Sequence, residues 1–484
     1  MKRTFALQKG VVLFLTAILV SLSATLTSFA QTSGAADSRT QNPAASNQDV
    51  ALKISDYMDA LVKAGWFNGS ILVARNGTVL ASKGYGMANF ELDVPNTPHT
   101  KFRLGSITKP FTAMAIMLLQ ERGKLSDQDS ICKYLPECPA TWQAITLRHL
   151  LSHTSGLAKH DTAGVYLKTA MIPMTLPQLI ESFKNKPADF KPGEKLDYNN
   201  NGYILLGYVI EKVSGQSYEA FVSDNIFKPL KMMDSGYDNH DPIIKNRAAG
   251  YRRAGTTLLN AAYIDQSQPF SAGALYSTTE DLLRLDQALY ENKFLSQKSL
   301  DAMFTPVAGI YGYGWFLNKQ FNRVAISHPG GVPGSAAMIT RYPEEKLLIV
   351  VLSNLENSRI IRASNDLAAI VLGEKYDLPK VRTAVEISAK VLEPYAGDYE
   401  DRPGRVSRIL VANGTLKLQL AAGAIGQIDP VPMSAESETE FFDPFNDTQV
   451  VFVKDASGQV TEMILRINGR EFHAKKIKKL PSFV

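Results

Sequence analysis

Ser106 and Lys109 stand three residues apart, directly before Pro110 and a long apolar run. Because proline is well tolerated only in the first turn of a helix, Pro110 predicts that the pair lies where a helix begins, with both side chains on one face. A hydroxyl there has a potential base beside it and the positive end of the helix dipole behind it. The pair indicates a nucleophilic serine. A helix N-cap is the alternative, and the same spacing recurs at Ser130 and Lys133 before a Tyr-Leu-Pro loop.

Two further motifs have side chains suited to catalysis or binding. Tyr198 and Asn200 precede a second apolar helix, where the alternative is a capping asparagine beside a packed tyrosine. The run His328-Pro329-Gly330-Gly331 ends one predicted strand and precedes another. Glycines at such a place let a substrate backbone approach closely, and a tight turn with an incidental histidine is the alternative.

In this order, Ser-x-x-Lys, Tyr-x-Asn and His-x-Gly resemble the motifs of the serine β-lactamase and penicillin-binding protein superfamily. The similarity is greatest to its class C β-lactamase-like branch, which includes D-alanyl-D-alanine carboxypeptidases, D-aminopeptidases and esterases. The phrase Leu-Leu-Ser-His-Thr-Ser-Gly-Leu at 150–157 adds to the likeness. The resemblance covers residues 50–372. The C-terminal part resembles, more weakly, the small domains appended to some members.

The resemblance implies a role for each motif. Ser106 would be the acylated nucleophile, with Lys109 and Tyr198 acting as a coupled pair that takes up the proton and delivers it to the leaving group. Asn200 would bind the substrate amide. The backbone N–H groups of Ser106 and Gly331 would form the oxyanion hole, and no metal or organic cofactor is implied. The substrate-binding residues are thus predicted to be Asn200, His328, Gly330 and Gly331.

His328 occupies the place of the lysine that is usual in this superfamily. The change argues against efficient β-lactam hydrolysis and leaves room for esterase or peptidase activity. An unperturbed histidine titrates near about pH 6.5, so a ring facing the pocket would lose its charge over the neutral range. Binding of carboxylated substrates would then weaken as pH rises. The alternative is a ring held neutral that hydrogen-bonds Tyr198 or the substrate.

The elements that must position these residues follow from the hydrophobic pattern. A helix is predicted from Val50, a hairpin over 70–82 around Asn76-Gly77, and mostly helices over 108–300. Strands are predicted at 323–327, 335–341 and 347–353, with a helix over 360–372. Because strands stand at both ends of this segment, they most simply pair in one antiparallel sheet covered by helices. The predicted class is α+β, with a mostly helical subdomain.

The remaining segments complete the predicted domain organisation. Residues 1–30 have the basic, apolar and small-residue regions of a secretory signal peptide, with an uncleaved membrane anchor as the alternative. Residues 31–49 are predicted to be a flexible linker and 50–378 the hydrolase domain. Short strands over 386–484, with turn signals at Asn413-Gly414, Ser457-Gly458 and Asn468-Gly469, predict a small β-barrel-like domain.

Export also affects the interpretation of the cysteines and histidines. In an oxidising compartment Cys132 and Cys138 would close a small disulfide loop, with two free thiols as the alternative. His149 and His153 share the spacing of a metal-binding helix pair, but no further ligand cluster follows, so two ordinary helix histidines are predicted. No metal site is expected.

The chain has 484 residues, 45% of them hydrophobic, and a net charge of +5, which excludes a wholly disordered protein. No basic stripe indicates nucleic-acid binding. The sequence predicts an exported serine hydrolase, periplasmic or secreted, that forms an acyl-enzyme with a D-Ala peptide, a β-lactam or a small ester. The substrate would be a small molecule or peptidoglycan-derived, with no membrane span after signal cleavage. The alternative is an exported penicillin-binding or sensor-like protein with little turnover. The oligomeric state is not indicated.

Overall fold

The computed structural model describes residues 46–159, 170–254, 257–291, 294–356, 358–421, 430–444, 448–467 and 470–477. The predicted signal peptide, and the linker as far as residue 45, lie outside these residues. Helix α2 (Asn47–Lys63) begins two residues before the predicted end of the linker, because Ser46 and Asp49 form a capping box at its start. The described chain forms two compact units, and each is described by itself. The larger contains the residues up to Tyr251 and from Asn260 to Leu378, and the smaller contains those of 252–259 and from Pro379 onward.

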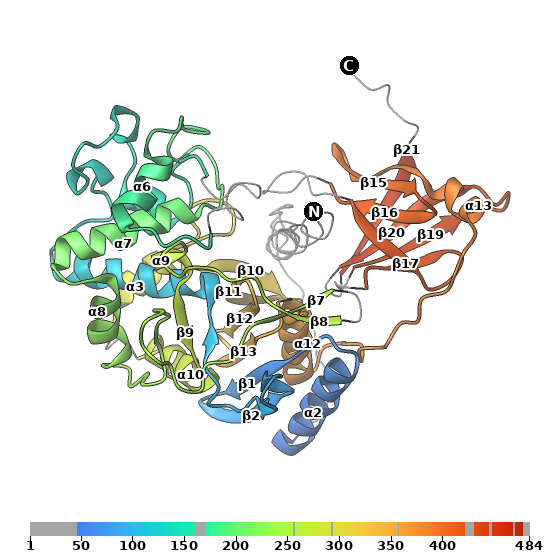
Figure 1. Cartoon of the computed structure of the whole chain (residues 1–484), viewed down its shortest axis with the longest axis horizontal. Helices are drawn as coiled ribbons and strands as arrows, with labels where there is room; N and C mark the ends of the chain where they lie inside the picture. The colour runs from blue at the N-terminus through green and yellow to red at the C-terminus, as the bar shows by residue number, and fades with distance from the viewer. Residues whose placement is uncertain are drawn as a thin grey trace, which may run out of the picture. The chain divides into compact units, whose positions relative to one another are not determined.

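The larger unit contains one six-stranded antiparallel sheet in the order β10-β11-β12-β13-β1-β2 (Figure 1). Its first and last parts meet where Gly69 of β1 pairs with Ser353 of β13, which confirms the prediction of a single sheet built from both ends of the segment. The strands are β1 (Gly69–Arg75), β2 (Thr78–Tyr85), β10 (Phe316–Gln320), β11 (Arg323–Val332), β12 (Ser335–Tyr342) and β13 (Leu347–Ser353).

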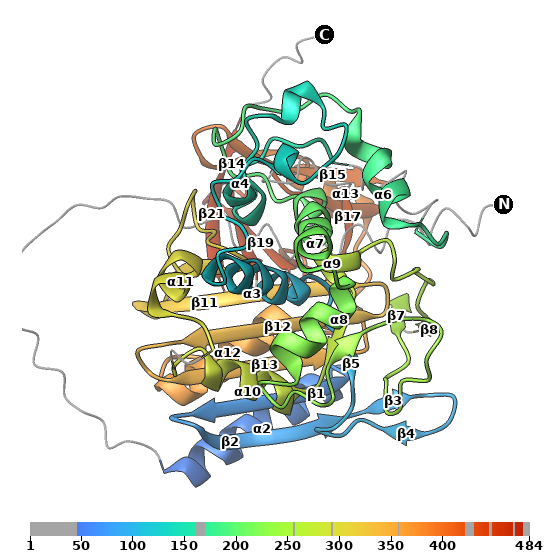
Figure 2. The same cartoon turned by 90° about the vertical axis from the view of Figure 1, so that its left-hand side faces the viewer.

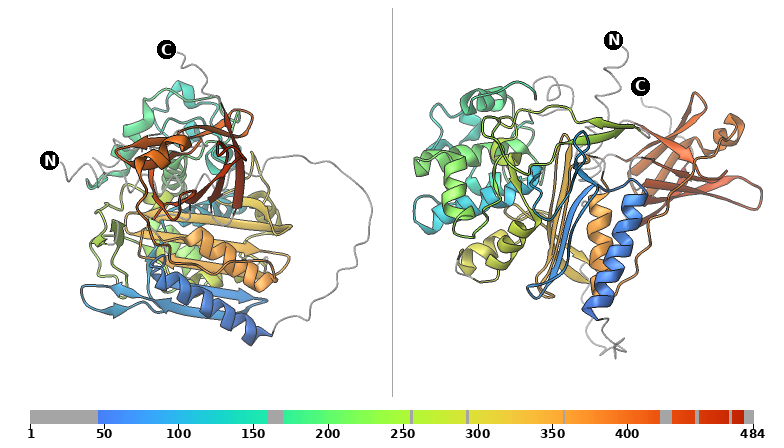
Figure 3. Two further views of the ribbon diagram at one scale, coloured as in Figure 1. Left: turned by 90° about the vertical axis from the view of Figure 1, so that its right-hand side faces the viewer. Right: turned by 60° about the horizontal axis from the view of Figure 1, so that its bottom comes forward.

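Helices cover both faces of this sheet. On one face α2 and α12 (Ile360–Leu372) lie side by side, as Figure 3 shows. The mostly helical subdomain lies on the other face (Figure 2). Its helices are α3 (Thr108–Glu121), α4 (Leu147–Leu151), α6 (Leu176–Lys184), α7 (Asn200–Ser214), α8 (Tyr218–Val222), α9 (Phe270–Gly273), α10 (Thr279–Ala288) and α11 (Gln297–Met303).

Helix α3 is the centre of the subdomain, since its residues 108–119 are all buried. A helix that is apolar on all sides must be surrounded, and α3 packs against α7, α8, α9 and α11. The larger unit also contains short strands: β3 (Met87–Asn89), β4 (Val94–Pro95), β5 (Phe102–Arg103), β6 (Gly236–Tyr237) and β9 (Leu275–Ser277). The paired strands β7 (Tyr251–Ala254) and β8 (Thr257–Asn260) fall mostly within the smaller unit.

The smaller unit contains a closed antiparallel barrel, which confirms the predicted C-terminal β domain. Its core includes Tyr395 stacked on Phe452, with ring centroids 4.1 Å apart. Helix α13 (Ala389–Leu392) precedes it. The strands are β14 (Gly397–Arg402), β15 (Arg405–Ala412), β16 (Thr415–Gln419), β17 (Val431–Ala435), β18 (Glu440–Phe442), β19 (Thr448–Lys454), β20 (Val460–Ile467) and β21 (Arg470–Ile477).

No helix within the described residues combines the length and the hydropathy that a transmembrane span requires.

Candidate active site

Ser106 lies in a 3-10 turn, η1 (Gly105–Ile107), that leads directly into α3. The N-cap position of α3 belongs to Ile107, and that of η1 to Leu104. Ser106 therefore caps neither element, and the capping alternative is wrong. Its side chain is half-buried at the start of the helix, as the position of Pro110 predicts.

The backbone of turn η1 packs directly against the backbone of β11. A Cβ atom at Gly330 would lie 1.9 Å from the carbonyl oxygen of Leu104, and one at Gly105 would lie 2.5 Å from the nitrogen of Gly331. Gly105 also has a φ of +52°, a left-handed conformation that favours glycine. On the Cβ side of Gly330 the approaching backbone is thus that of the serine turn, and this contact by itself requires glycine at 330.

The run His328–Gly331 belongs to the interior of β11, which continues to Val332, so both the predicted strand end at 327 and the tight-turn alternative are wrong. Val332 pairs with Ser335 across a two-residue turn, and such a flanking pair exchanges hydrogen bonds. The N–H of Gly331, one residue earlier, therefore points away from β12. It faces the edge that β10 leaves open beyond Ser327, beside η1.

The Nζ atom of Lys109 connects the motifs. It lies 3.1 Å from Ser106 Oγ, 2.9 Å from Asn200 Oδ1 and 2.9 Å from the carbonyl oxygen of Ala272. The lysine is fully buried, and Nζ is 4.8 Å from the centroid of the Tyr198 ring. The structure thus brings Ser106, Lys109, Tyr198 and Asn200 together.

Tyr198 and Asn200 stand at the start of α7. The N-cap is Asn199, whose side chain accepts a hydrogen bond from the N–H of Asn201 (2.9 Å). A capping asparagine does stand beside Tyr198, but it is Asn199 and not Asn200 of the motif. Because the side chain of Asn199 accepts a backbone N–H at the start of α7, the side chain of Asn200 can bind Lys109 and face the site.

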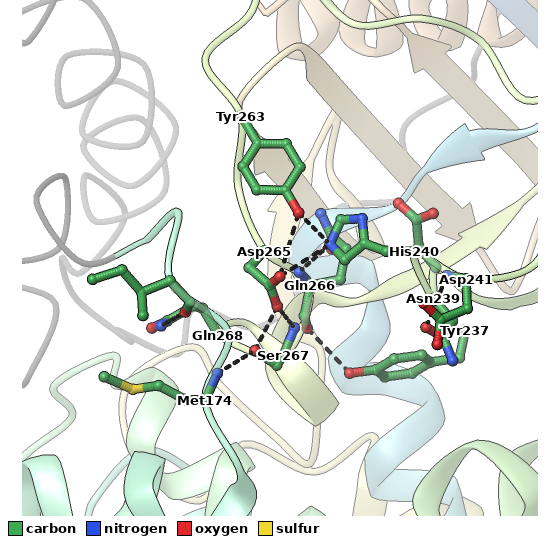
Figure 4. A network of polar contacts seen from close by, with 12 residues as sticks. Met174, Tyr237, Asn239, His240, Asp241, Tyr263, Asp265, Gln266, Ser267 and Gln268 are labelled. Carbon is green, nitrogen blue, oxygen red and sulfur yellow. Dashed lines mark hydrogen bonds and ion pairs between the residues drawn. The ribbon is translucent and has the colours of Figure 1, made fainter.

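The segment before α9 is held by a polar network, shown in Figure 4. The backbone N–H of Gln266 donates to His240 Nε2 (3.1 Å), and the hydroxyl of Tyr237 donates to the carbonyl oxygen of Gln266 (3.1 Å). These bonds hold the chain segment that leads into α9. Helix α9 in turn supplies the Ala272 carbonyl oxygen that binds Lys109.

His328 is fully buried in β11. Its Nδ1 donates to the carbonyl oxygen of Pro329 (2.6 Å), so Nε2 is the acceptor for the hydroxyl of Tyr311 (3.0 Å). Burial, followed by the charge of Lys109, lowers the pKa of His328 to about 3. The ring is neutral throughout the neutral range, and the expectation that it carries a titrating charge there is wrong. Tyr311, not Tyr198, is its hydrogen-bonding partner.

Two residues of the site were missed by the motifs. Tyr311 hydrogen-bonds His328 and packs against the rings of Tyr198 and Phe316, in a Gly-Ile-Tyr-Gly run that resembles an ordinary loop. His153 was predicted to be a helix histidine. It instead lies beyond the end of α4 with a φ of +57°, so it shares no helix face with His149.

The second Ser-x-x-Lys pair has a different setting. Ser130 caps a short 3-10 turn, η2 (Ile131–Lys133), and donates to the carbonyl oxygen of Gln143 (2.8 Å). Lys133 pairs with Asp129. The adjacent Cys132 and Cys138 are joined in a disulfide, with Cα atoms 5.2 Å apart.

The family model named Beta-lactamase matches residues 54–372, which contain every motif described above. The chain belongs to this family. It is a serine hydrolase of the β-lactamase and penicillin-binding protein fold, as the named relatives indicate.

The chain is 32% identical to a penicillin-binding protein of Bacillus subtilis (strain 168), over 85% of this chain and 95% of that one. It is 30% identical to a teichoic acid D-alanine hydrolase of Staphylococcus aureus, over 63% and 75%. Among solved structures, a penicillin-binding protein from Bacillus halodurans superposes with a TM-score of 0.58 at 29% identity, covering 65% of this chain and 98% of the other.

Proposed function

We propose that this family member is an exported hydrolase of D-alanyl esters or amides that acts through an acyl-enzyme at Ser106. The observation that carries the proposal is the contact of a fully buried lysine amine with a half-buried serine hydroxyl at the start of a helix. A relative named teichoic acid D-alanine hydrolase supports the D-alanyl part. The pattern of residues 1–30 supports the export.

The hydrogen bonds of Lys109 suit it to accept a proton in the first step. A neutral amine has two N–H donors and one lone pair. If the donors bind Asn200 Oδ1 and the Ala272 carbonyl, the lone pair faces the Ser106 hydroxyl and can accept its proton. The resulting ammonium then donates to all three oxygens, so the same geometry accommodates both protonation states.

In the proposed reaction, Ser106 Oγ attacks the carbonyl carbon while its proton passes to the Lys109–Tyr198 pair. The N–H groups of Ser106 and Gly331 bind the oxygen that becomes negative. The bond to the leaving alcohol or amine then breaks, and the leaving group takes the proton through Tyr198. Water then attacks the acyl-serine ester and gives a proton to the Lys109–Tyr198 pair. The pair returns a proton to Ser106 Oγ as the ester bond breaks, which releases the acid and restores the hydroxyl.

Mature protein beginning at residue 31 tests this proposal. A fluorophosphonate probe should label Ser106, and a D-alanyl ester and a D-amino-acid amide should each be turned over many times. A cephalosporin and a D-Ala-D-Ala peptide are assayed for turnover beside these two substrates. Labelling followed by a single burst without steady turnover would support the penicillin-binding or sensor-like alternative. Absence of labelling would contradict the acyl-enzyme itself.

A further inference from the structure

His153 contacts Tyr198 and both of its neighbours in the chain. The backbone N–H of Asp197, just before Tyr198, donates to the carbonyl oxygen of His153 (2.9 Å). The N–H of Asn199, just after it, donates to Nδ1 of the His153 ring (3.1 Å). The two rings also pack together, with centroids 4.2 Å apart. One residue therefore binds both backbone neighbours of the tyrosine as well as its ring.

The hydrogen bond from Asn199 determines the tautomer of His153. Because a backbone N–H can only donate, Nδ1 must be the acceptor, and the proton of the neutral ring lies on Nε2. Burial and the charge of Lys109 hold the pKa of His153 well below its usual value, so the ring stays neutral.

The rest of the His153 ring is enclosed. The residue is 1% exposed, and Nε2 has no hydrogen-bonding partner among the described residues. The rings of Tyr203 and Tyr311 lie with centroids 5.0 and 4.6 Å from it. Leaving a buried N–H without a partner costs free energy, as does the left-handed backbone with a φ of +57°. Such costs are tolerated where a side chain has a task that other residue types cannot perform.

We infer that His153 is a positioning residue that sets the backbone and ring of Tyr198 for proton transfer at Ser106. The inference rests on the proposed function, because it concerns the tyrosine of that reaction. The acceptor at Nδ1 is the essential element, since it binds the N–H that follows Tyr198. The packing of the His153 ring against the ring of Tyr198 is the second contact that positions the tyrosine.

Two matched variants test the role of the acceptor. Both remove the ring, but Asn at 153 keeps an oxygen near the place of Nδ1, whereas Gln carries its oxygen farther out. H153Q should slow single-turnover acylation by about 100-fold, the scale of a misplaced catalytic group, with KM changed by less than about 3-fold. H153N should stay within about 10-fold of the natural protein. Equal acylation rates in H153Q and the natural protein would overturn the inference.

His149 supplies the control. Its Nδ1 also accepts a backbone N–H, from Thr146 (3.2 Å), but it lies inside α4 and its bond only closes a capping box. H149Q should change the melting temperature and leave acylation within about 2-fold, because only a local cap is altered. A loss of acylation in H149Q as large as in H153Q would mean general damage and would overturn the inference.

A double mutant separates this inference from the proposed function. If His153 acts through Tyr198, adding H153Q to Y198F should slow acylation by less than about 2-fold, because the positioned group is already absent. If the losses in acylation rate caused by the two substitutions multiply, the inference is overturned and the proposed function stands. Fast acylation in Y198F by itself would overturn the proposed role of Tyr198, and the inference with it.

Discussion

The two largest sheets within the described residues are assembled in different ways. In the barrel every strand from β14 to β21 pairs with the next strand in sequence, and β21 closes on β14. In the larger unit β1 pairs with β13, which joins residues 69 and 353. Local pairing is signalled by turns, whereas distant pairing depends on the whole unit. The active site lies where chain segments far apart in sequence meet.

The interiors differ as well. The barrel core is made of packed side chains such as Tyr395 and Phe452. The larger unit buries Lys109, His153 and His328 beside its apolar core. Burying such groups requires hydrogen-bonding partners, and a chain that serves only to fold would use apolar residues there. The larger unit therefore contains the candidate catalytic groups, whereas packed apolar side chains dominate the core of the barrel.

The largest effect is expected from S106A. The change removes the nucleophile, so probe labelling should disappear and hydrolysis should fall by at least about 1,000-fold. Because Ser106 caps no helix, the melting temperature should hardly change. S130A is the matched control from the second Ser-x-x-Lys pair and should keep full activity. Undiminished hydrolysis in S106A would show that Ser106 is not the nucleophile, and the proposed difference between the two units would no longer hold.

The barrel is tested by F452A. Phe452 is 3% exposed and packs on Tyr395 and Phe441, so its truncation should destabilise the barrel by about 3–5 kcal/mol. Labelling of Ser106 should continue at the natural rate, as it should in a chain ending at Lys380. Calorimetry and probe labelling of the same samples check both parts. Loss of labelling in either protein would show that the barrel contributes to the site.

A smaller effect is expected from joint replacement of Cys132 and Cys138 by alanine. A loop this short restricts the unfolded chain modestly, so the larger unit should lose about 2–3 kcal/mol of stability. The barrel should melt as before. Denaturant titration with separate probes for the two units measures the difference. Equal shifts in both units would contradict their independence.

The smallest effect concerns His328 and pH. With a pKa of about 3, the ring binds no proton at pH 5.5 or above, so no charge is lost on going to about pH 7.5. KM for a carboxylated D-Ala-D-Ala peptide should therefore change with pH in parallel with KM for a neutral ester. Steady-state kinetics with both substrates measures this. A KM that rises with pH for the peptide alone would show a charged His328.

Much of the fold was predictable because its signals are local. Asn76-Gly77 forms the β1–β2 turn with both residues at positive φ, and Asn413-Gly414 connects β15 to β16. Ser457-Gly458 lies between β19 and β20, whereas the predicted turn at 468–469 lies outside the described residues. Strand β10 was not predicted, because its run of Leu, Asn, Lys and Gln has no clear alternation.

The sequence by itself determined the residue types of the site, their order and the family. Proline at 110 located the helix start, and apolar alternation located the strands. The tertiary structure alone decided which groups touch and in which state of protonation. The neutral state of His328 comes from burial beside Lys109, and the roles of Gly330 and His153 come from chain segments distant in sequence. Burial and backbone contact are properties of the packed unit, and a single chain segment does not contain them.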